Sequence, residues 1–253
     1  MTFSTSISGG VLALSREQTR WLSTGHDGGY STAESAYNVS VPESFERTDL
    51  QSYRKERLTE AGFEVEGPTL FTGVDMRHAR GARTDPVLAV ATVGLSNPAA
   101  LPVASIDHVE TTEDERDRLT VSDAQQEDGE ERKASDPHPG TVNVLLGTTE
   151  PLSDGGLAGL LGTVVEAKTA TLLGLSGFPG TTTDAVVVGC PVMGAGSAFA
   201  GSATRLGSAA RAAVRDAIRA SFESRYHDRE VPETVEDAEY GVSTDRMTAV
   251  FDP

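Results

Sequence analysis

The chain has 253 residues with 38 acidic and 21 basic side chains, so its formal net charge is −17 at pH 7. Such a surface repels nucleic acids and anionic membranes, and neither is an expected partner. The single cysteine, Cys190, excludes an intramolecular disulfide and a cysteine-rich metal site. The length permits one sizeable core, and we expect a single domain over residues 1–227 with an acidic tail at 228–253.

Three features of the sequence bear on where in the cell the protein is located. The first ten residues lack a basic segment followed by a long apolar one, so no signal peptide is predicted. The uncharged stretch 185–204 is interrupted by Pro191 and four glycines, which favours a strand and a loop over a membrane span. Only three basic residues are lysines, a composition that resembles proteins from cells with molar internal salt. A cytoplasmic protein is expected.

The first part of the chain predicts a β-meander. Over residues 2–42, short alternating runs (VLALS, TRWLS and SAYNVSVP) are typical of half-buried strands, with GHDGG in one turn. A helix then begins after Thr48 or Asp49 and ends at Gly62, which supplies the left-handed conformation of a helix stop.

Two further strands and a polar insertion follow. GPTLFTGVDM predicts a strand that ends at Asp75, and PVLAVATVGLSNP predicts a buried strand that ends in a turn at Asn97-Pro98. Residues 105–139 contain twelve acidic and four basic side chains with almost no large apolar ones. Such a segment cannot bury enough surface to offset its ordering entropy, so a long acidic loop insertion is predicted.

The second half predicts a strand-helix-strand-helix unit. A strand begins at Thr141, a long helix is capped by Ser153 or Asp154, the apolar run AVVVGC forms a second strand, and a third helix begins near Ser202 or Thr204. The tail from 228 onward is expected to pack loosely. Together the halves predict an α+β fold in which sheet and helices form a layered sandwich.

The long helix carries a lysine on its apolar side. Lys168 lies in the middle of a stripe formed by Leu157, Leu160, Leu161, Val164, Val165, Leu172 and Leu175. A Gly/Pro turn, three threonines at 181–183 and Asp184 then precede the apolar strand. We therefore expect Lys168, the threonines and Asp184 to converge at one edge of the sheet.

This convergence admits a catalytic and a structural interpretation. In the first, Thr182 or Thr183 is a nucleophile, Lys168 or Asp184 is its proton partner, and Asn97 or loop N–H groups stabilise an oxyanion. In the second, Lys168 and Asp184 form a buried ion pair and the threonines only turn the chain.

The GHDGGY stretch is a second candidate site. Gly28 and Gly29 permit close approach to a ligand, and His26 beside Asp27 is suited to acid, base or metal-ligand roles. The alternative is a hairpin turn made by Asp27-Gly28, with Tyr30 on the following strand. Because no second histidine stands at ligand spacing, no metal site is predicted.

Other polar residues at strand ends remain ambiguous. Asp75, Asn97 and Asn143 either face a pocket or satisfy backbone groups. The phosphate-binding, dinucleotide-binding and serine-hydrolase glycine motifs are absent from the sequence, so no cofactor is predicted.

Several separated motifs resemble one family, the adenosylcobinamide amidohydrolases. They are LSTGHDGGY (22–30), TGVDM (72–76), ATVGLSNP (91–98), GTVNVLL (140–146), EAKTATLLGL (166–175), GTTTDAVVVGCP (180–191) and FAGSATRLGSAA (199–210). The resemblance implies a cytoplasmic enzyme of corrinoid salvage that hydrolyses the amide between the corrin ring and aminopropanol and releases adenosylcobyric acid. Membership in these motifs adds Glu166 and Gly201 to Gly28, Gly29, Tyr30, Asp75 and Asn143 as expected substrate-binding residues.

The resemblance leaves the mechanism and the assembly open. A hydroxyl nucleophile competes with a water activated by His26, Asp27 or Asp75, with or without a divalent metal. A large planar corrinoid requires a broad cleft. A corrinoid carrier without activity and a hydrolase of another small amide are the alternative functions, and a homo-oligomer is possible.

Overall fold

A computed structural model of the chain describes residues 2–42, 45–103 and 140–252, and the predicted acidic insertion at 105–139 lies outside these residues. The strands are β1 (Ser4–Ser8), β2 (Val11–Ser23), β3 (Gly29–Ser40), β4 (Thr69–Thr72), β5 (Arg80–Thr84), β6 (Val87–Val93), β7 (Ala99–Ala100), β8 (Val142–Thr148), β9 (Ala185–Pro191) and β10 (Val242–Ser243). The helices are α1 (Leu50–Ala61), the 3-10 turn η1 (Met76–His78), α2 (Asp154–Ser176) and α3 (Arg205–Tyr226).

Strands β6, β8 and β9 form the buried part of one mixed sheet. The strand order is β4-β3-β2-β9-β8-β6-β5, with β1 paired to β2. Every residue of β6, β8 and β9 is buried, which explains their uninterrupted apolar sequences, since both faces of these strands are covered. β8 and β9 are parallel and are joined by α2, while β2 and β6 flank them in antiparallel orientation.

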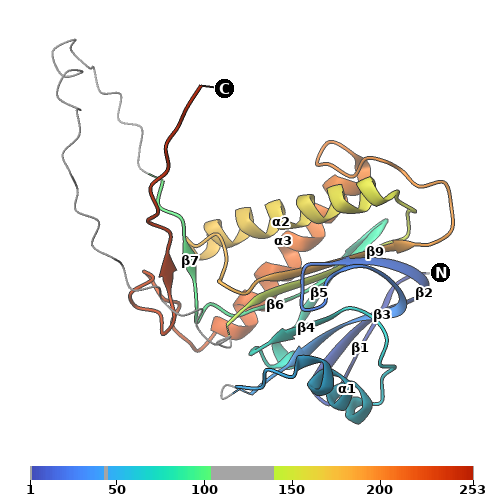
Figure 1. The fold of residues 1–253 in the computed structure, drawn as a ribbon, viewed down its shortest axis with the longest axis horizontal. Coiled ribbons are helices and arrows are strands. Elements are labelled where there is room, and N and C mark those ends of the chain that lie inside the picture. Colours follow the sequence, from blue (N-terminus) through green and yellow to red (C-terminus); the bar gives the residue numbers. More distant parts are fainter. Residues whose placement is uncertain (1, 43–44, 104–139, 253) are drawn as a thin grey trace.

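The elements stack in layers, as the sequence predicts for an α+β sandwich (Figure 1). Helices α2 and α3 cover one face of β6, β8 and β9. The other face packs against apolar side chains of β2, β3 and β4, because the N-terminal strands fold over it. Helix α1 in turn packs on the outer side of β2 and β3 through Tyr53, Leu58 and Ala61.

The meander prediction is correct in outline and wrong in one detail. VLALS and TRWLS belong to one long strand, β2, and not to two. The polar residues between them form an irregularity between Ser15 and Thr19, where Gln18 has φ of +51°. A bulge of this kind bends a strand without ending it, and the bend lets β2 pair with β3 along its length and with β9 at its second half.

The helix predictions are confirmed by their caps. Gly62 ends α1 with φ of +78°. The Ser153 hydroxyl accepts a hydrogen bond from Gly156 N at the start of α2, and Thr204 plays the same role for α3. By length and composition alone α2 is apolar enough to cross a membrane. In the fold its inner side is buried against β9 and α3, as in the core helix of a layered domain.

Two strand predictions need correction. β4 ends at Thr72 and does not reach Asp75, because the Asp75 carboxylate caps η1 by accepting a hydrogen bond from Arg77 N at 2.8 Å. β5 is absent from the sequence prediction. Its sequence RGART is polar and mostly exposed at the sheet edge, so it lacks the apolar pattern that marks the inner strands.

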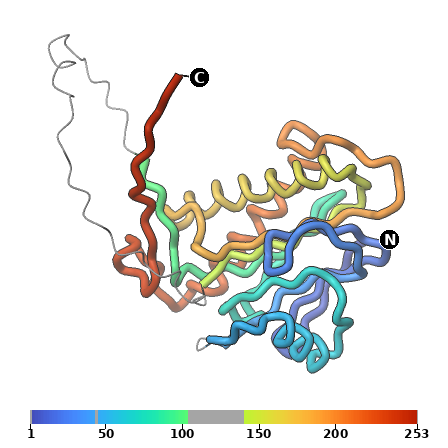
Figure 2. Tube along the Cα trace, in the orientation of Figure 1, coloured from blue at the N-terminus to red at the C-terminus, as the bar shows by residue number. Residues whose placement is uncertain are grey.

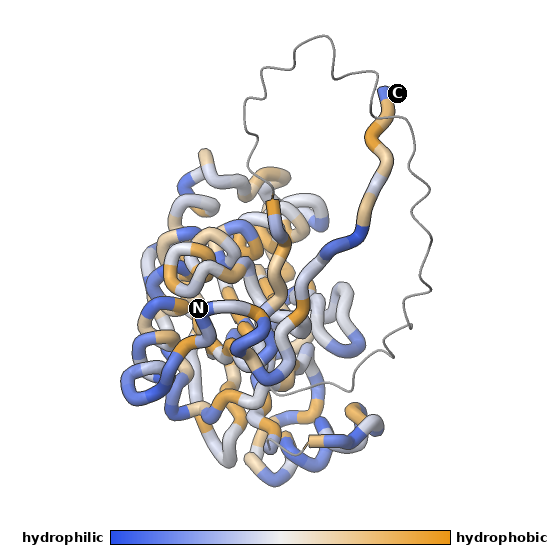
Figure 3. Tube along the Cα trace, turned by 90° about the vertical axis from the view of Figure 1, so that its left-hand side faces the viewer, coloured by the Kyte–Doolittle hydropathy of each residue, from blue (hydrophilic) through white to orange (hydrophobic). Residues whose placement is uncertain are grey.

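The acidic tail makes regular contacts that its composition does not indicate. β10 runs parallel to β7, with Val242 opposite Ala99 and Ser243 opposite Ala100. Beyond residue 244 the chain extends away from the body (Figure 2). Apolar segments are concentrated inside the layers, and the exposed end of the tail also carries apolar residues (Figure 3).

Candidate active site

Lys168 and Asp184 meet at the edge of the sheet where β8 and β9 begin. Lys168 Nζ donates a hydrogen bond to Asp184 Oδ2, and the side chains are only 7% and 11% exposed. Asp184 also accepts hydrogen bonds from Thr181 N at 3.2 Å, Thr181 Oγ1 at 2.5 Å and Val142 N at 2.9 Å. With four donors, the carboxylate is saturated and fixes the 181–184 turn against β8. The geometry therefore favours the ion-pair interpretation for these two residues.

Thr182 and Thr183 are exposed and share one hydrogen-bond donor. Asn97 is 1% exposed, and its Nδ2 donates to Thr182 Oγ1 at 2.7 Å and to Thr183 Oγ1 at 3.3 Å. The Thr183 hydroxyl donates to the Gly140 carbonyl oxygen at 3.0 Å. Both N–H groups of the Asn97 amide are thus used to orient hydroxyl oxygens, so this side chain is not a free oxyanion donor.

A pocket of about 380 Å³ opens beside this turn. It is lined by Thr24, Gly25, His26, Val41, Phe45, Leu50, Leu70, Phe71, Thr72, Gly73, Thr141, Thr183, Asp184 and Ala185. Only His26 and Asp184 in this lining are titratable, and Asp184 is already paired with Lys168. The pocket is therefore largely uncharged, with one imidazole and the hydroxyls of two exposed threonines, Thr24 and Thr183, on its walls.

His26 lies in the β2–β3 turn, as the hairpin interpretation requires. Its Nε2 is 3.5 Å from Asp27 Oδ2, and the His26 side chain is 39% exposed. Asp27 adopts φ of +51°, an unusual conformation for a residue with a side chain. Its carboxylate also accepts a hydrogen bond from Gln51 Nε2 of α1. A strained aspartate that contacts an imidazole beside a pocket is a pattern found at functional sites.

Asn143 belongs to a buried hydrogen-bond network. Its Nδ2 donates to Asn38 Oδ1 at 2.8 Å and to the Phe71 carbonyl oxygen at 2.9 Å. Asn143 Oδ1 accepts from Thr141 Oγ1 at 3.2 Å, and Asn38 Nδ2 donates to Thr92 Oγ1 at 2.9 Å. All polar atoms of the Asn143 side chain are satisfied inside the protein, which supports a structural role in fixing the register of β8.

The glycines of the GHDGGY stretch shape the turn. A side chain on Gly28 would place Cβ 2.5 Å from the Ser23 carbonyl oxygen, and Gly29 has φ of +97°. Tyr30 points elsewhere, because its hydroxyl donates to the Asp154 carbonyl oxygen at 2.9 Å. Asp154 begins α2, so it lies roughly 20 Å along the helix from Lys168 at 1.5 Å per residue.

Three further predicted residues lie outside the pocket lining. The exposed Glu166 pairs with Arg211 of α3 at 3.1 Å on the outer side of the helices. Gly201 precedes α3 and accepts a hydrogen bond from Thr204 N at 2.9 Å. Asp75 is exposed and caps η1. The structure thus brings His26, Asn97, Lys168 and the 182–184 turn together and leaves these three apart.

Sequence reasoning missed much of the pocket. The sequence analysis predicts that Thr181 lies near Asp184 but gives it no specific role, whereas in the structure its hydroxyl and its N–H both donate hydrogen bonds to Asp184. The apolar wall of Val41, Phe45 and Leu50 comes from the segment before α1 and from its first residue. No local pattern marks these side chains, because they become neighbours of residue 183 only through the folding of the N-terminal layer.

Comparisons with known proteins agree on one family. The family model described as adenosylcobinamide amidohydrolase matches residues 4–230. A protein of Halobacterium salinarum named adenosylcobinamide amidohydrolase is 44% identical over 253 residues, covering 99% of this chain and 100% of the relative. One of the same name from Methanosarcina mazei is 28% identical over 214 residues, covering 81% and 90%. No solved structure matches. The chain therefore belongs to the adenosylcobinamide amidohydrolase family.

Proposed function

We propose that this chain hydrolyses the amide that joins the corrin ring of adenosylcobinamide to 1-amino-2-propanol, and that the pocket beside the 181–184 turn holds the reacting amide. The products are adenosylcobyric acid and the free amine, a step of cobalamin precursor salvage. Family membership supports the reaction. The observation that carries the site is that a threonine hydroxyl and an imidazole line one mostly uncharged pocket. We further propose that the enzyme works in a cytoplasm of high salt, consistent with its net charge of −17.

The residues of this pocket match the needs of amide hydrolysis. A base is required for the nucleophile and an acid for the departing amine, and His26, oriented by Asp27, is suited to both roles. Thr183 supplies a hydroxyl on the pocket wall, and Thr182 stands next to it. Because the Asn97 amide is occupied by these hydroxyls, the oxyanion is left to backbone N–H groups of the turn other than those of Thr181 and Thr182, which donate to Asp184 and to the Asn97 carbonyl oxygen.

Two routes use this arrangement. In the first, Thr183 Oγ attacks the carbonyl carbon, His26 takes the hydroxyl proton and passes it to the leaving nitrogen, and water then hydrolyses the ester. In the second, His26 takes the proton from a water that attacks the same carbon directly. In both routes Lys168 and Asp184 hold the turn in place. In the described residues no three His, Cys, Asp or Glu side chains are grouped as metal ligands.

The pocket volume limits what it can enclose. At about 380 Å³ it lies at the lower end of ligand-site volumes, which suits the amide arm and part of the corrin edge. The apolar wall of Val41, Phe45 and Phe71 provides surface for that edge. The rest of the corrinoid then lies outside the pocket, against the protein surface.

A direct assay tests the proposal. Purified protein in molar KCl is incubated with adenosylcobinamide, and adenosylcobyric acid and free aminopropanol are measured by chromatography and mass spectrometry. Under the first route, Thr183→Ala lowers kcat by about a hundredfold or more, and His26→Gln does the same. Under the second, only His26→Gln has this effect. Thr32→Ala on the exposed face of β3 is the matched control. Full activity in the Thr182, Thr183 and His26 variants would exclude this pocket as the active site.

A further inference from the structure

The segment that carries Asn97 is bound along one edge to the active-site turn. The Asn97 carbonyl oxygen accepts a hydrogen bond from Thr182 N at 3.1 Å. Two residues further on, Ala99 N donates to the Gly180 carbonyl oxygen at 3.0 Å. These backbone contacts accompany the side-chain bonds from Asn97 Nδ2 to the Thr182 and Thr183 hydroxyls. The position of residues 96–100 therefore sets the position of both hydroxyls.

The opposite edge of this segment is bound to the C-terminal part of the chain. Three backbone N–H groups around β10 donate to three carbonyl oxygens around β7, at 3.1, 2.9 and 3.0 Å. The pairs are Tyr240 N with Ser96 O, Val242 N with Pro98 O, and Thr244 N with Ala100 O. Because neighbouring residues of a strand direct their carbonyls to opposite edges, Asn97 faces the turn while Ser96 and Pro98 face β10.

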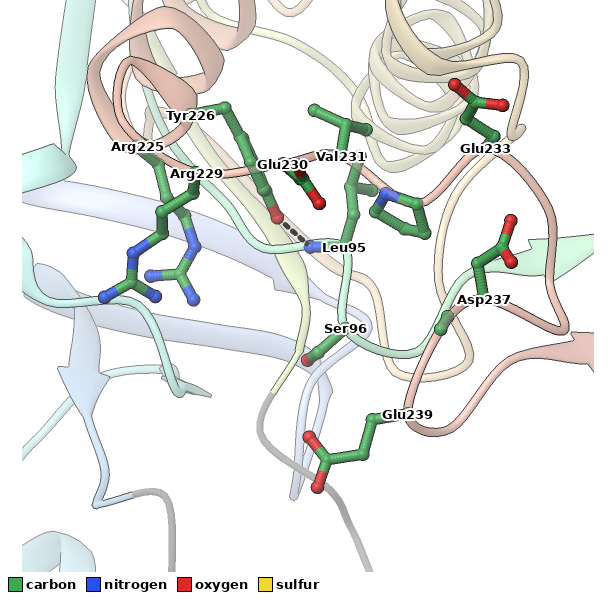
Figure 4. A pocket seen from close by; sticks show the side chains of 12 residues that line it. Leu95, Ser96, Arg225, Tyr226, Arg229, Glu230, Val231, Glu233, Asp237 and Glu239 are labelled. Atoms are coloured by element: carbon green, nitrogen blue, oxygen red, sulfur yellow. Dashed lines mark hydrogen bonds between the residues drawn. The ribbon is translucent and has the colours of Figure 1, made fainter.

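Hydroxyl groups of α3 hold the chain just before Asn97. Tyr226 Oη accepts a hydrogen bond from Leu95 N at 2.7 Å (Figure 4). Ser221 Oγ accepts one from Val93 N at 3.1 Å. These bonds fix residues 93–95 to the helix layer, but they end two residues before Asn97. From there to residue 100, β10 provides the support on the side away from the turn.

We propose that β10 is a positioning element of the active site. Its hydrogen bonds to Ser96 and Pro98 hold Asn97 in place, and Asn97 in turn orients the Thr182 and Thr183 hydroxyls. This inference rests on the proposed function, because it takes these hydroxyls to face the reacting amide. It assigns a catalytic consequence to a segment beyond residue 230, where the match to the family model ends.

The tail contributes little to the main core, so its effect is local. Both residues of β10 are exposed. Beyond residue 228, Val231 alone among the described residues packs against the large core cluster, and it is only partly buried. A pocket of about 810 Å³ separates the tail from the end of α3, with Ser96 and Glu239 on its walls (Figure 4). Loss of the β10 hydrogen bonds therefore leaves the layers of the fold intact.

A pair of proline variants tests the inference. Val242→Pro removes the N–H that donates to Pro98 O, while Ser243→Pro makes the same change one residue away, where no hydrogen bond from N–H to β7 is present. We expect Val242→Pro to lower kcat about tenfold or more, because small displacements of catalytic groups are costly, with KM changed less than about twofold. Ser243→Pro keeps the activity of the parent, and both variants unfold at the parent temperature. Equal activity of the two variants would overturn the inference.

Each proline change is also combined with Asn97→Ala. If β10 acts through Asn97, Val242→Pro lowers kcat in the parent and has no further effect in the Asn97→Ala background. Independent, multiplicative losses would show that β10 acts elsewhere and would overturn the inference. Full activity of Asn97→Ala alone would instead contradict the proposed role of the 182–183 hydroxyls, so the two failures are distinguishable.

Truncation repeats the test if Val242→Pro does not accumulate. A chain that ends at Glu239 lacks β10 and is expected to lose at least as much kcat as Val242→Pro. A chain that ends at Asp245 keeps the three hydrogen bonds and loses only the part that extends from the body (Figure 2). This control retains full activity. Equal kcat for the two truncations would also overturn the inference.

Discussion

The side-chain amide of Asn97 donates a hydrogen bond to the Thr182 hydroxyl at 2.7 Å, across 85 residues of sequence. This bond joins the segment after β6 to the turn before β9, two parts of the chain that meet only at the edge of the folded sheet. It places an amide that is almost completely buried directly behind two exposed hydroxyls. Substitutions of these residues and of their neighbours distinguish a role in catalysis from a role in stability alone.

Replacing Asn97 should separate activity from stability. Asn97→Ala removes the donor to both hydroxyls, so kcat should fall about tenfold or more as their orientation is lost. The same change removes Asn97 Oδ1, a buried oxygen without a hydrogen-bond partner in the described residues. The free energy of unfolding should therefore change by less than about 1.5 kcal/mol, since the lost hydrogen bonds are offset by the loss of this unsatisfied atom. Steady-state kinetics and urea unfolding measure the two effects, and a large loss of stability with unchanged kcat would contradict this prediction.

Replacing Asp27 should lower activity without lowering stability. Asp27→Gly relieves the left-handed conformation and is expected to retain or raise the unfolding temperature. It also removes the carboxylate that contacts His26 at 3.5 Å, so kcat should fall about tenfold or more. Asp27→Asn, which also tolerates this conformation, is the matched variant and should lose activity without a gain in stability. Parental kcat in both variants would show that Asp27 only shapes the turn.

The Lys168–Asp184 pair should behave as a structural unit. Lys168→Met leaves the Asp184 carboxylate buried without its cation and should cost about 3–5 kcal/mol of unfolding free energy. Combining it with Asp184→Asn should recover part of this loss, because the uncompensated charge is then removed. Chemical denaturation of the two single variants and the double variant measures the coupling. Additive losses would mean that the two side chains contribute independently.

His78 should make stability depend on pH. Burial lowers the pKa of His78 below its ordinary value of 6.5, and the nearby Arg77 and Arg225 lower it further, against the opposite effect of Asp75. Arg77 Nε donates to His78 Nε2 at 3.1 Å, a bond that requires this nitrogen to be unprotonated. The unfolded chain thus binds the proton at higher pH than the folded one. The stability from neutral His78 is present above pH 6.5 and is lost as the pH falls through the folded-state pKa.

Thermal unfolding between pH 7.5 and pH 5 measures this effect, over a range that extends about one unit above and about 1.5 units below an ordinary histidine pKa. His78→Gln should flatten the decrease in unfolding temperature on the acid side, because glutamine has no proton to bind. His227→Gln, at a side chain that is 82% exposed, should leave the decrease as it is in the parent. An identical slope in parent and His78→Gln would assign the acid sensitivity to other groups.

Local sequence signals predicted most of the elements because they act within one element. Gly62 ends α1, Ser153 and Thr204 cap their helices, and apolar runs mark β6, β8 and β9. The same reasoning placed Lys168 on the inner side of its helix, where a buried ammonium requires a nearby acid. It failed where the pattern is polar, as in β5, or where a bulge interrupts a strand, as in β2.

The sequence by itself determined the layered α+β fold class, the family and the proximity of Lys168 to Asp184. Each of these depends on periodicity, on motifs or on residues only 16 positions apart. The tertiary structure alone decided that Asn97 lies behind Thr182, that His26 faces the pocket of Thr183, and that β10 supports residues 96–100. These contacts depend on strand order and on the folding of the N-terminal layer. Both are set by the summed burial of segments that are distant in the sequence, so they leave no local pattern in the chain.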